Sequence, residues 1–178
     1  MVLLGKGLVK KTKIIHKFYK FINPNEHDPT VEDSYKTSIN LDGKDYDIEI
    51  LDTAGEDDCK NMLDMWITFG EGFLLVFSID NKESFEYTKK RYESIKKMKH
   101  KDQPVILVGN LKDCSDKERK VSYNEANQLA NSLGVDYFEV SSENGFNVVE
   151  VFKHLARKII QFKEKIKKNK KGKKCQIL

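Results

Sequence analysis

Three runs of almost unbroken apolar residues, at 73–79, 105–109 and 137–140, limit what this chain can fold into. A strand that is apolar at every position has both faces buried, as in a parallel sheet covered by helices on each side. Stretches with helical periodicity, at 84–98 and 124–133, separate the three runs. This alternation predicts an α/β fold built on a parallel sheet.

Further segments extend the predicted sheet. Residues 2–4 form a short apolar strand, followed by a glycine-rich loop and a helix at 11–21. Residues 35–41 and 45–51 alternate apolar and polar side chains around an Asp-Gly dipeptide, which suits a tight hairpin turn because both residues tolerate positive φ. We expect this pair to be antiparallel and to lie at a sheet edge.

Length and charge indicate one domain followed by a tail. A chain of 178 residues can form one well-packed core, which we place at residues 1–162 with a last helix that starts near Phe146. Residues 163–178 carry eight lysines and one glutamate, so the net charge of +4 comes from this segment. We expect the helix to dissolve into this low-complexity lysine tail.

The sequence offers no membrane span, signal peptide or disulfide framework. No apolar run approaches the roughly 18 residues that cross a bilayer, and the first residues lack a basic-then-apolar pattern. We therefore expect folding in the cytosol. Cys59, Cys114 and Cys175 are too few and too scattered for disulfides or a paired metal site, so we expect reduced thiols.

The stretch GKGLVKKT at 5–12 is close to the phosphate-binding loop G-x-x-x-x-G-K-[ST], with Lys10 at the second glycine. In such a loop, backbone N–H groups and a helix N-terminus surround phosphates. The lysine neutralises the terminal phosphates, and the hydroxyl after it binds Mg²⁺. Lys11 and Thr12 are correctly placed for these two roles.

Three more loops carry informative residues, because open parallel sheets bind ligands beyond the C-terminal ends of their strands. In DTAG, Asp52 could reach Mg²⁺ through water and Gly55 could offer an N–H to a γ-phosphate. In NLKD, Asp113 could accept both N–H groups on the edge of a guanine, an edge that adenine lacks. The polar loop HDPTVEDSY leads into the second strand.

These motifs, in this order, give the chain a resemblance to the Ras family of small GTPases, closest to its Ras and Rap branch. The most specific stretches are DPTVEDSY, GEGFLLVFSI and VILVGN. The resemblance covers about residues 2–162 and the last four residues. It implies a P-loop NTPase of the small GTPase fold, with a six-stranded, mostly parallel sheet, one antiparallel edge strand and about five helices.

The resemblance also implies a GDP/GTP switch with Mg²⁺ as cofactor. The residues implied to bind nucleotide are Gly5, Gly7, Lys10, Lys11, Thr12, Gly55, Asn110, Asp113, Ser141 and Ser142, with the backbone N–H of Ser142 on the guanine oxygen. Mg²⁺ would be held by Thr12, Thr30 and Asp52. Hydrolysis of GTP would involve Lys11, Thr30 and Glu56.

Several residues depart from the family pattern around the nucleotide. Lys10 adds a side chain where the backbone should pass close to the β-phosphate, yet its charge would favour a triphosphate, so loss and retention of tight binding both stay open. Leu8 replaces a second glycine. Leu111 replaces a lysine that ties two loops together, and Glu143 stands where the family has lysine. Weaker, faster-exchanging nucleotide is the expected consequence.

Two departures concern the base and the chemistry. Asn23 replaces an aromatic residue that flanks guanine, although Phe21 could substitute for it. Glu56 replaces the glutamine that orients the attacking water. A carboxylate there cannot donate a hydrogen bond to the developing charge and is repelled by the γ-phosphate, which predicts slow intrinsic hydrolysis. We expect His16, His27, His100 and His154 to be exposed, with no metal role.

The predicted effector loop keeps the letters of the family and comprises Asp28, Pro29, Thr30, Val31, Glu32, Asp33, Ser34 and Tyr35. In relatives, this loop and the next strand bind effectors by adding a partner strand to the sheet edge. An ordinary polar edge protected by charge is the simpler alternative. The resemblance favours effector binding and implies an exchange factor and a GTPase-activating protein as further partners.

The last four residues, CQIL, form a C-a-a-X box whose terminal leucine favours geranylgeranylation of Cys175. One lipid chain anchors marginally, and the lysines supply a second signal toward an anionic leaflet. This predicts attachment to the cytoplasmic face of the plasma membrane or an endomembrane. A nuclear-localisation run or an RNA-binding tail would not account for the box, and the tail lacks aromatic residues for stacking on bases, so we expect no nucleic acid partner.

The leading hypothesis from the sequence is a membrane-anchored GDP/GTP switch in signal transduction. The alternative is a pseudo-GTPase adaptor that keeps the effector face and the anchor without nucleotide switching. An ATP-using P-loop enzyme is disfavoured by Asn110 and Asp113.

Overall fold

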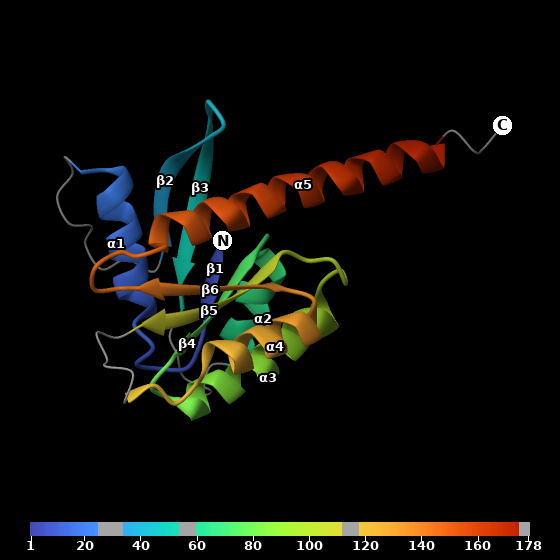
Figure 1. Ribbon diagram of the computed structural model, residues 1–178. Coiled ribbons are helices and arrows are strands. Elements are labelled where there is room, and N and C mark those ends of the chain that lie inside the picture. Colours follow the sequence, from blue (N-terminus) through green and yellow to red (C-terminus); the bar gives the residue numbers. More distant parts are fainter. Residues whose placement is uncertain (25–33, 54–59, 112–117, 175–178) are drawn as a thin grey trace.

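The computed structural model describes residues 1–24, 34–53, 60–111 and 118–174, and shows one six-stranded sheet with helices on both faces (Figure 1). The strands are β1 (Val2–Leu4), β2 (Ser34–Leu41), β3 (Lys44–Asp52), β4 (Phe73–Ser78), β5 (Val105–Leu111) and β6 (Asp136–Ser141). The helices are α1 (Lys11–Ile22), α2 (Lys60–Phe69), α3 (Lys82–Met98), α4 (Tyr123–Leu133) and α5 (Val148–Lys174). No helix within these ranges is both long and apolar enough to cross a bilayer.

The strand order is β2-β3-β1-β4-β5-β6, with only the β2–β3 pair antiparallel. This confirms the predicted six-stranded sheet with one antiparallel edge strand. Asp42 and Gly43 both have positive φ, 53° and 83°, as a two-residue hairpin turn of the primed type requires. Because β1, β3, β4, β5 and β6 run parallel, their C-terminal ends lie at one edge of the sheet.

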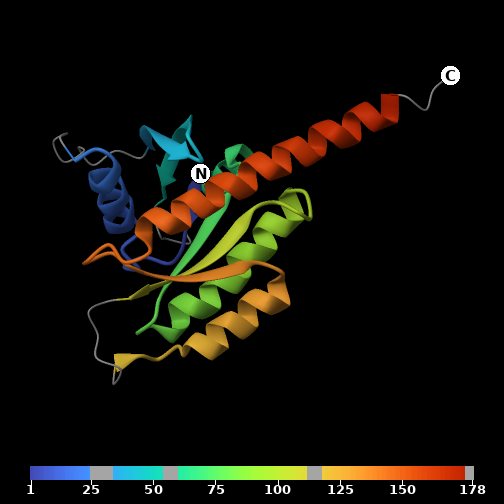
Figure 2. The ribbon, with the colours of Figure 1, turned by 45° about the horizontal axis from the view of Figure 1, so that its top comes forward.

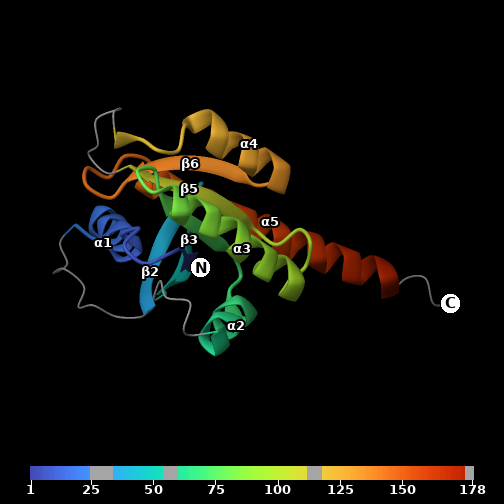
Figure 3. The same ribbon diagram turned by 90° about the horizontal axis from the view of Figure 1, so that it is seen from below.

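The sheet separates two hydrophobic layers, which explains the unbroken apolar runs. On one face, Leu74 and Val76 of β4 pack with residues of α1 and α5. On the other face, Leu75 and Phe77 of the same strand pack with α2, α3 and α4. Figures 2 and 3 show α3 and α4 together on one side and α5 on the other. β4 and β5 thus bury both alternating sets of side chains, whereas β6, at the end of the strand order, is half-buried over its first four residues.

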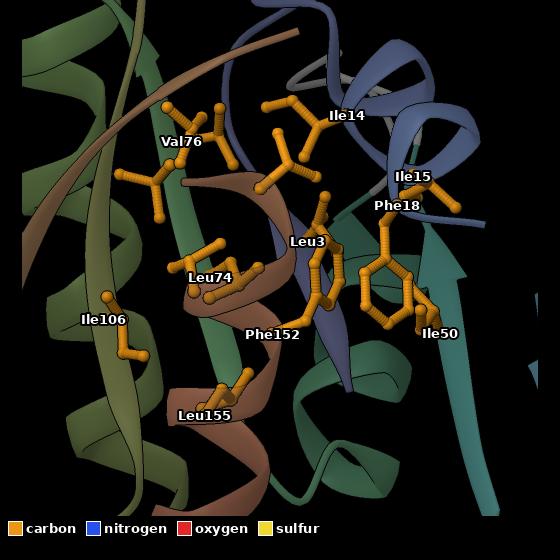
Figure 4. Close-up of a cluster of buried hydrophobic side chains, with 14 of the residues drawn as sticks. Leu3, Ile14, Ile15, Phe18, Ile50, Leu74, Val76, Ile106, Phe152 and Leu155 are labelled. Carbon is orange, nitrogen blue, oxygen red and sulfur yellow. The ribbon is translucent and has the colours of Figure 1, made fainter. Parts of the chain in front are cut away.

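The layer under α1 and α5 anchors the start of α1, and with it the loop that precedes the helix (Figure 4). Phe18 of α1 stacks on Phe152 of α5, with 4.1 Å between ring centroids. Both rings are fully buried, together with Ile14 and Ile15 of α1. The close packing of α1 against α5 and the sheet therefore fixes the position of residues 5–10, the loop before α1.

The C-terminal segment differs from expectation, because α5 continues through the predicted boundary at residue 162 and ends at Lys174. Lysine is a good helix former, and two ion pairs fix the first turns beyond the boundary. Lys163 pairs with Glu71, and Lys165 pairs with Asp102 at 2.8 Å. The last turns of α5 project beyond the sheet (Figure 1). The lysine tail thus begins as a helix and not as an irregular segment.

Candidate functional site

The loop between β1 and α1 has the close backbone packing of a phosphate-binding loop. Gly5 is buried directly after β1, and a Cβ at this position would lie 2.3 Å from the carbonyl oxygen of Val76 in β4. Only glycine fits this approach. Gly5 therefore sets the path of the loop as it leaves the sheet, before the chain turns into α1.

Lys11 points its ammonium group into this loop. Its side chain is 6 % exposed, and Nζ donates to the carbonyl oxygens of Gly5 at 3.1 Å and of Lys6 at 3.4 Å. Burial lowers the pKa of Lys11, and the nearby Asp52 carboxylate opposes part of that shift. A buried cation held by backbone carbonyls is well placed to receive phosphate oxygens.

Thr12 and Asp52 meet beside this loop, as the sequence predicts for a metal site. Asp52 ends β3, which pairs with β1, and its carboxylate accepts a hydrogen bond from the Thr12 hydroxyl. Hydroxyl and carboxylate oxygens are ligands that Mg²⁺ prefers, and Mg²⁺ usually shares its shell with water and substrate phosphates. Among the described residues, no group of three His, Cys, Asp or Glu side chains gathers. The Thr12 hydroxyl and the Asp52 carboxylate fit Mg²⁺ that takes its remaining ligands from water and phosphates.

The two substituted glycine positions keep the backbone that glycine favours. Leu8 and Lys10 have φ of 68° and 64°, in the left-handed region. That conformation costs an ordinary residue about 1–2 kcal/mol, so the loop is strained but formed. Leu8 is 97 % exposed, and Lys10 directs its ammonium to Glu143, at 2.8 Å. The steric cost expected at Lys10 therefore falls on its backbone, while the side chain turns to the β6–α5 loop.

Asn110, near the end of β5, joins three segments. It is 1 % exposed, and its Nδ2 donates to the Val9 carbonyl at 3.1 Å and to the Ser142 hydroxyl at 3.2 Å. Its Oδ1 accepts from the backbone N–H of Ser142 at 3.1 Å. Both amide hydrogens of Asn110, and the N–H assigned to guanine at Ser142, have partners within the protein. The contact of Asn110 and Ser142 with a guanine base stays a prediction. It requires their internal hydrogen bonds to be shared with the base or exchanged for bonds to it.

Ser141 shapes the loop after β6. Its hydroxyl accepts from the backbone N–H groups of Glu143 and Asn144, both at 3.2 Å. The backbone N–H of Ser141 donates to the Phe146 carbonyl oxygen at 3.0 Å. The buried Ser141 hydroxyl thus organises the turn that presents Ser142 and Glu143, which we call the base loop and define as residues 141–147.

The comparison with known proteins agrees with this geometry. The sequence model of the Ras family matches residues 1–161. The Ras-like protein rasZ of Dictyostelium discoideum is 37 % identical over 174 residues, which cover 97 % of this chain and 81 % of rasZ. The Ras-like protein rasV of the same organism is 39 % identical over 167 residues, which cover 93 % of this chain and 72 % of rasV. This chain belongs to the Ras family.

Ras-family proteins are GTPases that use Mg²⁺ with GTP or GDP and interact with effectors, exchange factors and activating proteins. In this Ras-family chain, Phe21 borders the base loop and Asn23 does not. A Cβ at Gly145 would lie 2.2 Å from the Phe21 ring, which is 53 % exposed. Asn23 Nδ2 instead donates to the Thr37 hydroxyl of β2 at 3.0 Å. Phe21, unlike Asn23, is thus an aromatic residue beside the base loop.

The effector-loop residues Asp28 to Asp33 lie outside the described part of this Ras-family chain, as do Gly55, Glu56, Asp113 and Cys175. Ser34 and Tyr35 begin β2, the edge strand. The Tyr35 side chain is 2 % exposed on the inner face of the pleat, so any contact of Tyr35 with an effector would be made by its backbone, and its place in the effector face stays a prediction. Its hydroxyl lies 3.0 Å from Nε2 of His16, which is half-buried and not at the surface as expected.

The sequence analysis missed several residues that support the site. Thr53 is buried, and its hydroxyl donates to the Leu3 carbonyl at 2.6 Å, which fixes the end of β3 beside β1. Arg119 binds both carboxylate oxygens of Glu139 in β6, at 2.7 and 3.0 Å. These pairs join segments far apart in the chain, so no local pattern indicates them.

Proposed function

We propose that this chain is a guanine-nucleotide switch that binds GDP and GTP with Mg²⁺ and attaches to a membrane. The observation that carries the proposal is the convergence of Lys11, Thr12 and Asp52 at the C-terminal ends of β1 and β3. A buried ammonium beside two hard oxygen ligands suits a polyphosphate with its divalent cation.

Within this proposal, each residue has a separate task. Lys11 donates to the terminal phosphate oxygens in place of its present loop carbonyls. Thr12 and Asp52 hold Mg²⁺, with Thr30 joining them in the GTP state. Gly5 and Gly7 keep the loop close enough for its N–H groups to reach the phosphates. The carboxylate of Asp113, three positions after Asn110 in the sequence, selects guanine.

The edge strand β2 supports effector binding by strand addition. Its outer side forms no ladder within the described sheet, because β2 stands at one end of the strand order. Ser34 donates to Glu49 of β3 at 2.7 Å, so an acidic side chain lies beside the start of this edge. Lys36 of β2 also lies 3.8 Å from Glu49, so the complementary charge for a basic partner strand would come from Glu32 and Asp33 of the preceding loop.

Nucleotide binding is tested by denaturing the purified protein, separating the released small molecules by anion exchange, and titrating a fluorescent guanine nucleotide with and without Mg²⁺. Stoichiometric GDP or GTP, with binding that excess ATP does not compete, supports the switch. The absence of both co-purified nucleotide and saturable binding would instead support the adaptor alternative, in which nucleotide plays no part in partner binding. The observation in favour of this alternative is that Asn110 and Ser142, the residues assigned to guanine, already hydrogen-bond to each other.

Slow intrinsic GTP hydrolysis is expected because Glu56 stands at the position that orients the attacking water. The variant Glu56→Gln should hydrolyse bound GTP at least tenfold faster in a single-turnover assay, since an amide can donate a hydrogen bond to the developing charge. Glu56→Ala, which removes the repulsion without adding a donor, should gain much less. Equal rates for the chain, for Glu56→Gln and for a glutamine-bearing Ras protein would contradict this expectation.

Membrane attachment is proposed through geranylgeranylated Cys175 together with the lysines of the tail, at the cytoplasmic face of the plasma membrane or an endomembrane. In cells, Cys175→Ser should move the full chain from the membrane fraction to the soluble fraction, because lysines alone bind an anionic leaflet only weakly. Replacing Lys170, Lys171, Lys173 and Lys174 with glutamine should weaken attachment at least tenfold while lipidation persists. A Cys175→Ser variant that stays in the membrane fraction would refute the anchor.

A further inference from the structure

Glu143 connects the two loops that would hold opposite ends of a nucleotide. Its Oε1 accepts from Lys10 Nζ at 2.8 Å, and its Oε2 accepts from Lys13 Nζ on the first turn of α1. Lys10 and Glu143 are 133 positions apart, and their side chains are 32 % and 25 % exposed. The partly buried pair thus joins the phosphate loop directly to the base loop.

Both partners of this pair are held in place by their surroundings. Lys10 occupies the residue before α1 with φ of 64°, so its side chain leaves from a fixed backbone position. The backbone N–H of Glu143 donates to the buried Ser141 hydroxyl at 3.2 Å. Asn110 links the same two loops a second time, because its Nδ2 donates both to the Val9 carbonyl and to the Ser142 hydroxyl. The pair therefore acts between two ordered loops and not between two mobile surface side chains.

The electrostatics favour the charged form of Glu143 beside the two lysines. Hydrogen bonds from Lys10 and Lys13 lower the pKa of the Glu143 carboxyl to about 2. The carboxylate therefore stays ionised at neutral and mildly acidic pH, with one ammonium on each oxygen. A cation at position 143 would instead face Lys10 and Lys13, which explains why a lysine there would be unfavourable in this chain.

The substitutions at positions 10, 111 and 143 then form one coupled set. Glycine is replaced by lysine at 10, and lysine by glutamate at 143, so the new charges are opposite and in contact. Leu111 stands where the family has a lysine that ties two loops together, and its side chain has no polar atom for such a connection. We propose that the Lys10–Glu143 pair replaces that connection and positions the base loop on the phosphate loop, so that Glu143 is a positioning residue for guanine nucleotide; this rests on the proposed function.

A double-mutant cycle in the full chain tests the pair. The variants are Lys10→Gly, Glu143→Lys and the double variant, and the readout is the dissociation rate of a fluorescent GDP in excess Mg²⁺. Glu143→Lys alone should release nucleotide about tenfold faster, because a third cation separates the two loops. The double variant should return to within about threefold of wild type, since it removes the repulsion from Lys10 and the left-handed strain and leaves only the repulsion from Lys13.

Two controls separate positioning from general stability. Glu83→Lys disrupts the ion pair between Lys6 of the same loop and α3, which does not reach the base loop, and should leave the rate within about twofold of wild type. Glu143→Gln should release nucleotide faster at low salt and lose the salt dependence that wild type shows, a change that a purely structural role would not produce.

The outcomes distinguish this inference from the proposed function. The positioning role would be overturned if Glu143→Lys released GDP at the wild-type rate. It would also be overturned if the rate changes of the two single variants simply multiplied in the double variant. Either result would leave the proposed nucleotide binding intact. If wild type binds no guanine nucleotide, the proposed function and the positioning role both fail. In that case the unfolding temperatures of the same four proteins would show coupling only if the pair is a structural brace.

Discussion

Replacing Lys11 with methionine is expected to weaken guanine nucleotide binding at least 100-fold. The Lys11 ammonium is buried, lies against the carbonyls of Gly5 and Lys6, and is the cation best placed to meet the terminal phosphates. Each hydrogen bond to a charged group contributes about 1.5–3 kcal/mol. If Lys11 makes two such bonds to phosphate oxygens, in place of its two bonds to carbonyls, losing both costs about 3–6 kcal/mol. Every 1.4 kcal/mol is a factor of ten in affinity.

The fold should survive this change, which makes the affinity loss interpretable. Burial already disfavours the charged form of Lys11, as its lowered pKa indicates, and a methionine fills the space of the apolar stem. The unfolding temperature without nucleotide should therefore stay near that of wild type. Titration of fluorescent GDP measures the affinity, and Lys6→Met, which removes a half-exposed lysine of the same loop paired to Glu83, is the control. Binding by Lys11→Met within tenfold of wild type would contradict the assigned role.

The sequence predicted the sheet well because local patterns encode it. Unbroken apolar runs gave the strands buried on both faces, and Asp42-Gly43 gave the hairpin. Two helical segments carried no such pattern. In α2, Leu63, Trp66 and Ile67 face the core and Asp64 and Thr68 face solvent, but the exposed apolar side chains of Met62, Met65 and Phe69 blur the boundary between the two faces. The last turns of α5 are polar all round, which conceals the helix for the opposite reason.

The candidate site was predictable in its residue types and not in its contacts. Lys11, Thr12 and Asp52 follow strands of the same sheet edge, so their convergence follows from the topology. The direction in which Lys10 turns depends on a partner 133 positions away, and the internal bonds of Asn110 depend on Val9 and Ser142. Such long-range pairs leave no trace in a local motif. The inward direction of Tyr35 depends likewise on the register of β2 against β3.

Replacing Gly5 with alanine is expected to destabilise the protein by about 3 kcal/mol, near the upper end of the cost of overpacking a core. The added Cβ would stand 2.3 Å from the Val76 carbonyl oxygen, and a backbone atom of a central strand cannot move aside as a side-chain tip can. The loop would have to shift instead. That shift would displace the Gly5 carbonyl that receives Lys11, so nucleotide binding should weaken along with stability.

Gly43→Ala is the control that separates steric overlap from backbone strain as the cause of lost stability in Gly5→Ala. Gly43 has φ of 83° in the exposed hairpin turn, and a Cβ there would meet no atom within 4 Å. Its replacement should cost about 1 kcal/mol, from backbone conformation alone, and should leave nucleotide affinity unchanged. Urea unfolding of both variants without nucleotide measures the two costs. A Gly5→Ala protein as stable as Gly43→Ala would show that the loop yields easily, and that the close approach to β4 does not determine the shape of the phosphate site.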